Sequence, residues 1–117
     1  IIKAMENPNI DEIFHPTGRV IQKREEYKVD IDEFIKAAKR TKTVMEIDAY
    51  PDRLDLKDDY IRKAVEAGVK LSIDSDSHST VHFQYLELGI GQARRGWAES
   101  SDIINTRGWK EMSELLK

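Results

Sequence analysis

Short apolar runs alternate along this chain with segments whose apolar residues recur at helical spacing. Residues 12–14, 43–47 and 69–73 are short and rich in apolar or β-branched side chains, which predicts three strands. Residues 31–38 and 57–67 place apolar side chains three or four positions apart, which predicts two helices that each bury one face. Strands that alternate with helices are typical of a parallel sheet. The pattern therefore predicts an α/β fold of parallel βα units, either open or barrel-like.

Polar residues mark the ends of these two predicted helices. Asp30 precedes the first helix and suits the N-cap position, with Glu33 at the reciprocal capping position. Gly68 follows the second helix, where glycine readily takes the left-handed conformation that ends a helix. The side chains expected to face inward are Ile31, Phe34, Ile35 and Ala38 in the first helix, and Tyr60, Ile61, Ala64 and Val65 in the second.

Four further segments complete the predicted outline. Residues 1–6 predict the last turns of a helix that ends at Asn7-Pro8, and residues 17–28 predict a long polar loop. Another amphipathic helix is expected to stop at Gly89, and a final one to cover residues 109–116. The inward side chains expected in these two helices are Val81, Tyr85 and Leu88, then Trp109, Met112, Leu115 and Leu116.

Three strands are too few to close a sheet on itself. The first helix also begins at residue 1 without a capping residue. We therefore expect residues 1–117 to be the carboxy-terminal portion of a larger domain that is truncated on its N-terminal side. Such a piece leaves strand edges uncovered, which favours a homo-oligomer of this chain.

Composition supports a folded chain and excludes several classes of site. The chain is 39% hydrophobic and 35% charged over 117 residues, which is typical of one globular domain. It has no cysteine, which excludes disulfides, thiolate metal sites and a cysteine nucleophile, and is compatible with a cytoplasmic location. No apolar run approaches the ~20 residues of a membrane helix, and no secretory leader is recognised, so no membrane partner is expected. The net charge of -3 argues against a general electrostatic grip on DNA.

Polar side chains that suit metal binding follow the predicted strands. His15 comes directly after residues 12–14, and Asp74, Asp76 and His78 come directly after residues 69–73. Ligands of parallel α/β folds collect at the carboxyl ends of strands. In extended backbone, residues two apart point the same way, so these last three side chains are expected to share one face. Carboxylate and imidazole ligands together suit zinc or manganese.

Each of these signals has a structural alternative. A histidine before Pro16 is also typical of a turn, and Asp76 also suits the N-cap of a following helix. Glu46 lies inside an apolar strand, where an unpaired carboxylate is costly. Arg53 is a candidate partner for Glu46 or for a substrate phosphate. His82 is interpreted as a surface residue of a helix.

Five motifs in order carry a resemblance to a known family. They are His15-Pro16-Thr17-Gly18-Arg19, Met45-Glu46-Ile47-Asp48-Ala49, Arg53-Leu54-Asp55-Leu56, Ser75-Asp76-Ser77-His78-Ser79 and Gly91-Gln92-Ala93-Arg94-Arg95-Gly96-Trp97. Together they resemble the carboxy-terminal PHP (polymerase and histidinol phosphatase) domain of bacterial and archaeal family X DNA polymerases. The resemblance runs over essentially the whole chain and implies the carboxy-terminal half of that domain.

The resemblance implies a distorted seven-stranded, TIM-like α/β barrel with a cluster of three divalent metals, manganese or zinc in the first place and magnesium as a further option. Its metal ligands match His15, Asp76 and His78. Glu46 matches a position near the site that is not itself expected to bind metal, whereas Arg53 and Arg19 match arginines expected to hold phosphate. The family's upstream His-x-His motif is absent from this sequence. Asp48 and Tyr50 stand where the family usually carries asparagine.

The implied function is hydrolysis of phosphate esters at DNA 3′ ends, as a 3′–5′ exonuclease or a 3′-phosphatase in repair synthesis. The partners implied are DNA 3′ ends, the missing N-terminal half of the domain and a polymerase domain that guides the DNA. Two alternatives stay open. One is a small-molecule phosphatase of the same superfamily, similar to histidinol phosphatase. The other is a non-catalytic module that braces the polymerase.

Overall fold

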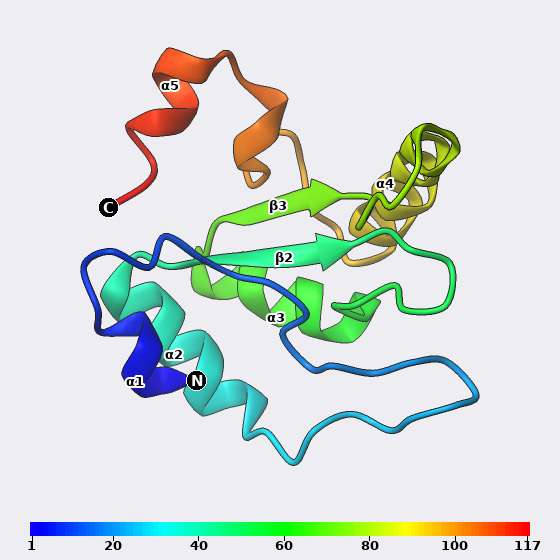
Figure 1. Ribbon diagram of the computed structural model, residues 1–117. Helices are drawn as coiled ribbons and strands as arrows, with labels where there is room; N and C mark the ends of the chain where they lie inside the picture. The colour runs from blue at the N-terminus through cyan, green and yellow to red at the C-terminus, as the bar shows by residue number, and fades with distance from the viewer.

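Three parallel strands form the centre of the structure, a computed structural model that describes residues 1–117 (Figure 1). The strands are β1 (Glu12–Ile13), β2 (Val44–Asp48) and β3 (Leu71–Asp74), and they lie side by side in that order. In register, Ile13 lies opposite Met45, and Met45 lies opposite Leu71. The predicted α/β class with parallel βα units is confirmed.

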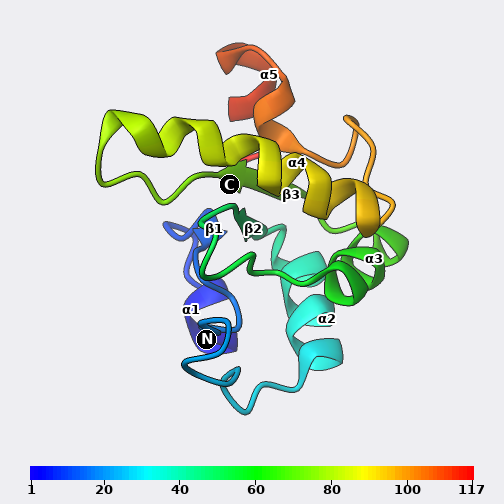
Figure 2. The ribbon, with the colours of Figure 1, turned by 90° about the vertical axis from the view of Figure 1, so that its right-hand side faces the viewer.

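Helices connect and cover these strands. They are α1 (Ile2–Met5), α2 (Ile31–Thr41), α3 (Asp58–Ala67), α4 (Leu86–Arg95) and α5 (Trp109–Ser113), with short 3-10 helices η1 (Thr80–Tyr85) and η2 (Ile104–Thr106). α2 and α3 lie together on one side of the sheet, and α4 lies beyond the carboxyl ends of β2 and β3 (Figures 1 and 2). None of the helices combines the length and the apolar character needed to cross a membrane.

The ends of α2 and α3 follow from their sequences. The Asp30 side chain caps α2 by accepting a hydrogen bond of 3.1 Å from the backbone amide of Glu33. Gly68 ends α3 in the left-handed conformation, with a φ of 74°. Lys42 ends α2 in the same way with a φ of 55°, although no glycine signals it in the sequence. The predicted caps at Asp30 and Gly68 are confirmed.

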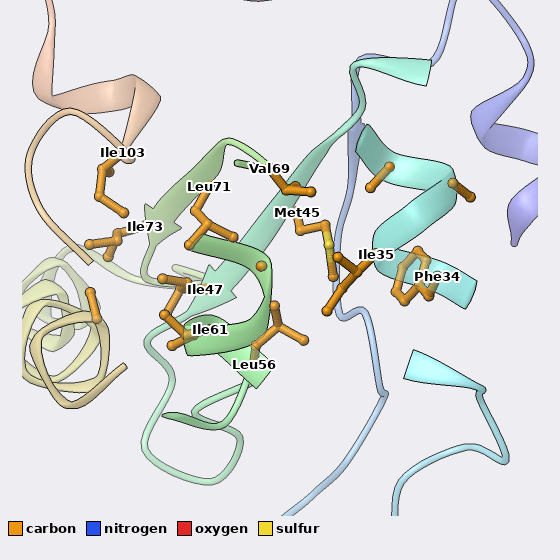
Figure 3. Close-up of a cluster of buried hydrophobic side chains, with 14 of the residues drawn as sticks. Phe34, Ile35, Met45, Ile47, Leu56, Ile61, Val69, Leu71, Ile73 and Ile103 are labelled. Atoms are coloured by element: carbon orange, nitrogen blue, oxygen red, sulfur yellow. The ribbon is translucent and has the colours of Figure 1, made fainter. Parts of the chain in front are cut away.

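The hydrophobic core lies between the sheet and the helices α2 and α3. Met45, Ile47 and Leu71 point to this side of the sheet, where they meet Ile35 of α2 and Ile61 of α3 (Figure 3). All five side chains are buried. Because alternate residues of a strand point to opposite faces, the same spacing turns Glu46 and Asp48 to the other face of β2. The packing of the core thus decides which side chains are left for the site.

The predicted end of the third amphipathic helix at Gly89 is wrong. α4 continues through Gly89 to Arg95, and Gly89 is buried against β2 and β3. A Cβ at this position would lie 2.6 Å from Ile73 Cγ2 and 2.8 Å from Ala49 Cβ, so glycine serves a close approach rather than a helix end. The inward side chains predicted there are also wrong in part, because Val81 and Leu88 are exposed.

The final helix is shorter than expected and its first aromatic residue does not pack. α5 ends at Ser113, and Trp109 is 71% exposed rather than packed against the body. Met112, Leu115 and Leu116 are half-buried, in line with the prediction. A single turn at residues 1–6, the helix α1, buries Met5 in the core.

The predicted long loop between β1 and α2 is confirmed and is fastened to the start of α3. Glu26 Oε1 lies 2.9 Å from Lys57 Nζ, and the Tyr60 hydroxyl donates a hydrogen bond of 2.9 Å to Glu26 Oε2. The Lys57 ammonium also lies 4.1 Å from the centre of the Tyr60 ring. Burial by itself raises the pKa of Glu26, but the hydrogen bonds from Lys57 and Tyr60 outweigh it and lower this pKa.

Glu26→Gln is expected to remove an acid-sensitive part of the stability. A carboxyl whose pKa is lower in the folded state stabilises the fold above its unfolded pKa, and this contribution is lost as the pH falls. The wild-type chain should exceed the variant by about 0.5 kcal/mol in unfolding free energy at pH 7 and by almost nothing below about pH 3. Urea unfolding at both pH values measures this. An equal difference at the two values would contradict the role of the Glu26 charge.

Candidate metal centre

The face of the sheet turned away from α2 and α3 is unusually acidic. Strand β2 places Glu46 and Asp48 on it, and their partners in the register of β3 are Ser72 and Asp74. Glu46 and Asp48 are almost completely buried. Buried carboxylates require partners, because desolvation of an unpaired charge costs several kcal/mol. This face is therefore organised around polar contacts rather than apolar packing.

Three strand ends bring one imidazole and two carboxylates together. His15 follows β1, Asp48 ends β2 and Asp76 follows β3. One ligand atom from each of the three lies within 4.8 Å of the others. His15 Nδ1 lies 3.0 Å from Asp48 Oδ2. The structure thus brings together two of the three predicted metal-binding residues, His15 and Asp76, and adds Asp48.

His78 does not join this group. Its Nδ1 lies 2.6 Å from the backbone carbonyl oxygen of Asp76, and its backbone amide donates to His82 Nδ1 at 3.1 Å. The expectation that Asp74, Asp76 and His78 share one face assumed a continuous extended backbone. Asp76 instead has a φ of 47°, which ends the extended run and turns the chain after it. The expectation that these three side chains share one extended face is therefore wrong, whereas metal binding by His78 stays a prediction.

Two members of the group hold left-handed backbone conformations. His15 has a φ of 48° and Asp76 has a φ of 47°. Residues other than glycine adopt this region at a cost of about 1 kcal/mol or more, and such strain concentrates at functional sites. At His15 the backbone amide donates to the Glu46 carboxylate, and at Asp76 the amide donates to Asp74 Oδ1 at 3.1 Å. Acidic side chains of the same face thereby fix both turns.

Arg53 reaches the group from the loop after β2. Its Nε lies 3.5 Å from Asp48 Oδ2 and 3.6 Å from Asp76 Oδ2. Arg53 therefore contacts Asp48 and Asp76 rather than Glu46, the side-chain partner considered from the sequence. Its contact with a substrate phosphate stays a prediction. The Arg53 side chain is 25% exposed, so it is partly accessible to solvent beside the carboxylates.

Arg19 lies close by but binds backbone. Its Nε donates to the carbonyl oxygen of Arg53 at 2.8 Å, and a second nitrogen donates to the carbonyl of Leu54. Arg19 thus fixes the loop that carries Arg53. Its predicted contact with phosphate stays a prediction.

Burial raises the pKa of the two carboxyls that β2 places on this face. Desolvation raises the pKa of Glu46 to about 10, and a hydrogen bond with Asp74 acts in the same direction. Desolvation also raises the pKa of Asp48 to about 6, against the opposing effects of the Tyr50 amide and His15. A positive charge close to Asp48 favours its ionised form. The chemistry of the donors, one imidazole beside carboxylates crowded in a partly buried place, fits a divalent cation.

Asp55 fixes the loop that follows His15. This fully buried carboxylate accepts hydrogen bonds from the amide of Thr17 at 3.0 Å, the Thr17 hydroxyl at 2.8 Å and the amide of Gly18 at 2.9 Å. Its own backbone pairs with Asp48 at the end of β2. Desolvation raises the pKa of Asp55, whereas the bonds from Thr17 and Gly18 favour the charged form. Asp55 therefore joins the two loops that position His15 and Arg53.

Sequence reasoning missed Asp48 as a member of the group. The available signal was its place at the carboxyl end of a predicted strand, two residues after Glu46, which the alternation of a strand puts on the same face. Asp55 was missed as a structural residue, and nothing in the spacing of its motif indicates its three hydrogen bonds. Glu46 lies in the predicted place beside the group without belonging to it.

Comparison with known proteins gives one informative relative. No protein family model matches the chain. The chain is similar to DNA polymerase/3'-5' exonuclease PolX of Bacillus subtilis (strain 168), with 40% identity over 114 residues. The match covers 97% of this chain and 20% of the relative. The chain thus spans about a fifth of the length of the curated relative it matches.

Proposed function

We propose that this chain, which belongs to the family X DNA polymerases, contributes part of a divalent-metal phosphoesterase site. The reaction proposed for this site is the removal of nucleotides or phosphate from DNA 3′ ends. The observation that carries the proposal is the convergence of His15, Asp48 and Asp76 at the ends of three parallel strands. The name of the relative, DNA polymerase/3'-5' exonuclease PolX, supports the same chemistry. The activity is proposed for a longer protein that contains this chain, because the chain spans only 20% of the length of the relative.

His15, Asp48 and Asp76 are the residues that would hold the cation, with His78 as the further candidate from the sequence. A bound divalent cation supplies Lewis-acid polarisation to a phosphoryl group. Imidazole and carboxylate ligands favour manganese or zinc, and the carboxylates also accept magnesium. The remaining ligands of a larger cluster would come from other parts of a closed seven-stranded barrel of the PHP type.

Arg53 is the residue proposed to hold the substrate phosphate. Its guanidinium lies beside the carboxylates of Asp48 and Asp76, and the side chain is partly exposed. A guanidinium at this place can donate hydrogen bonds to the non-bridging oxygens of a phosphate and offset their charge. Arg19 acts on Arg53 through two backbone carbonyls and is proposed to position it. Glu46 orients His15 through the His15 amide.

The test compares the full-length polymerase that contains this segment with its Asp76→Ala variant. Release of nucleotide and of phosphate from a 3′-labelled primer is measured with manganese and without nucleoside triphosphates, so that polymerisation does not contribute. Loss of a charged ligand at the reacting centre is expected to lower the rate about 100-fold or more. Asp32→Ala is the matched control, because Asp32 is an exposed carboxylate of α2 paired with Lys63.

Equal rates for the wild type and Asp76→Ala would overturn the proposal and favour a module that braces the polymerase without catalysis. Activity on a small phosphate monoester but not on the primer would instead favour a phosphatase of the histidinol phosphatase kind. Melting temperatures of the variants establish that the fold is intact in each comparison.

A further inference from the structure

Helix α4 is followed by a tryptophan in a backbone conformation that usually belongs to glycine. Trp97 has a φ of 62°. Its amide donates to the carbonyl oxygen of Arg94 at 3.0 Å, and the amide of Ala98 donates to the carbonyl oxygen of Ala93 at 3.0 Å. This is the Schellman ending of a helix, in which glycine is preferred because a side chain strains the left-handed backbone. Trp97 is therefore held firmly, but in a strained conformation.

Glycine stands one residue earlier, where the packing of two helices requires it. A Cβ on Gly96 would lie 2.3 Å from Ile61 Cγ2 and 2.9 Å from the carbonyl oxygen of Asp58. Gly96 thus lets the end of α4 approach α3, and Figure 2 shows this end of α4 beside α3. The close approach accounts for Gly96, but it does not account for a tryptophan at the next position.

The packing of this chain makes little use of the Trp97 ring. Trp97 is 66% exposed and does not belong to the hydrophobic core. The guanidinium carbon of Arg62 lies 3.8 Å from the centre of the ring, and Arg62 Nε pairs with Glu66 Oε1 at 3.0 Å. A cation–π contact at the surface stabilises a fold only weakly. It does fix the direction of the ring, so the indole is exposed and yet held in one orientation.

An ordered and exposed tryptophan beside arginines is typical of the centre of a protein interface. Tryptophan and arginine are enriched among the residues that dominate binding energy, and side chains that are ordered in advance lose less entropy on binding. Arg95 pairs with Asp58 at 2.9 Å, whereas Arg94 is exposed and enters no ion pair within this chain. This surface therefore offers a partner one indole and one unpaired positive charge.

The charges favour a partner other than a second copy or DNA. A two-fold contact would place this surface against itself and bring like charges together. The carboxylates of Asp58 and Glu66, which pair with Arg95 and Arg62, lie at the same place and repel a DNA backbone. The match to the relative covers 20% of its length, so the other four-fifths of that protein lies outside the match. Another part of one long polypeptide is the partner that fits.

We propose that Trp97 is the anchor by which this chain docks on another part of the longer polypeptide that contains it. That part receives the indole in an apolar recess and places a carboxylate beside Arg94. Docking gives the left-handed backbone at Trp97 a function, because the buried indole offsets the strain. The inference rests on the length of the relative and is independent of the reaction proposed above.

Acrylamide quenching of tryptophan fluorescence tests whether the ring is covered in the full-length polymerase that contains this segment. In the 117-residue chain, Trp109→Phe leaves Trp97 as the sole tryptophan. In the full-length protein, the Trp97 signal is the difference between the wild type and Trp97→Phe. Efficient quenching is expected in the chain, and several-fold weaker quenching in the full-length protein.

Equally efficient quenching in both proteins would overturn the inference. Protection that appears only at high protein concentration would overturn it in favour of a second copy. Protection that requires added DNA would overturn it in favour of a nucleic-acid contact.

Trp97→Gly separates docking from a role in the fold of this chain. In the 117-residue chain, glycine relieves the left-handed strain while the contact with Arg62 is lost, so the melting temperature should stay within about 3 °C. In the full-length protein, loss of the anchor should lower it by about 5 °C or more. Trp109→Ala removes a ring that is 71% exposed on α5 and should change neither value.

A fall of equal size in both proteins would overturn the inference, because Trp97 would then serve only the fold of this chain. Arg94→Glu provides a second variant at an exposed position that leaves the left-handed turn intact. It should lower the melting temperature of the full-length protein alone. No change there, together with no change in Trp97→Gly, would also contradict docking.

Discussion

Asp48→Ala is expected to weaken Mn²⁺ binding by the 117-residue chain about 100-fold, whereas His78→Ala should change it far less. Asp48 lies with His15 and Asp76 in the only group of three ligand atoms within 4.8 Å of one another. Loss of residues that merely orient metal ligands already costs about 10- to 100-fold in affinity, and removal of a charged ligand should reach at least the upper end. Isothermal titration of the two variants with MnCl₂ measures the difference.

The pair of variants separates two ligand sets. The resemblance implied His15, Asp76 and His78, whereas the structure groups His15, Asp48 and Asp76. A large loss in His78→Ala with a small loss in Asp48→Ala would contradict the set found in the structure. Asp52→Ala controls for the removal of one negative charge, because this exposed carboxylate pairs only with Lys23 on the surface.

Asp55→Ala is expected to lower the free energy of unfolding by about 3 kcal/mol. The variant leaves two backbone amides and the Thr17 hydroxyl without their acceptor in a fully buried place. Each buried donor without a partner costs about 1–3 kcal/mol, and entry of water recovers part of the sum. Urea unfolding at pH 7 measures the change.

The Asp55→Asn variant tests whether the loss of unfolding free energy comes from the missing hydrogen-bond acceptor. Asparagine has almost the same volume and keeps one acceptor oxygen, but its amino group faces donors, so an intermediate loss is expected. Removing the exposed Asp52 should cost under about 1 kcal/mol, as for other surface ion pairs. A change in Asp55→Ala as small as that of Asp52→Ala would show that Asp55 does not hold the loop after His15.

The elements with strong local signals were predictable, and those set by close packing were not. α2 and α3 appear where the spacing of apolar residues and the caps at Asp30 and Gly68 place them. The end of α4 was predicted wrongly, because Gly89 carries the usual signal of a helix end. Its actual role, a close approach to Ile73 and Ala49, depends on residues distant in sequence.

The residues of the candidate site also fall into those that could be predicted from the sequence and those that could not. The positions of His15 and Asp76 at strand ends follow from the order of strands and helices, since parallel strands bring their carboxyl ends to one edge. The place of His78 outside the group of His15, Asp48 and Asp76 depends on one backbone angle, the left-handed φ of 47° at Asp76. No periodicity predicts such an angle, because it is held by a hydrogen bond from Asp76 to Asp74 within the folded turn.

The sequence by itself determined the α/β class, the two principal helices, the resemblance to the family X DNA polymerases and the places of His15 and Asp76 at strand ends. These depend on local spacing and on motifs that remain readable in one dimension. Only the tertiary structure decided that Asp48 lies with His15 and Asp76, and that Arg53 faces Asp48 and Asp76. The physical reason is that these relations join separate strand ends and loops, whose distances are fixed by packing and buried hydrogen bonds rather than by sequence separation.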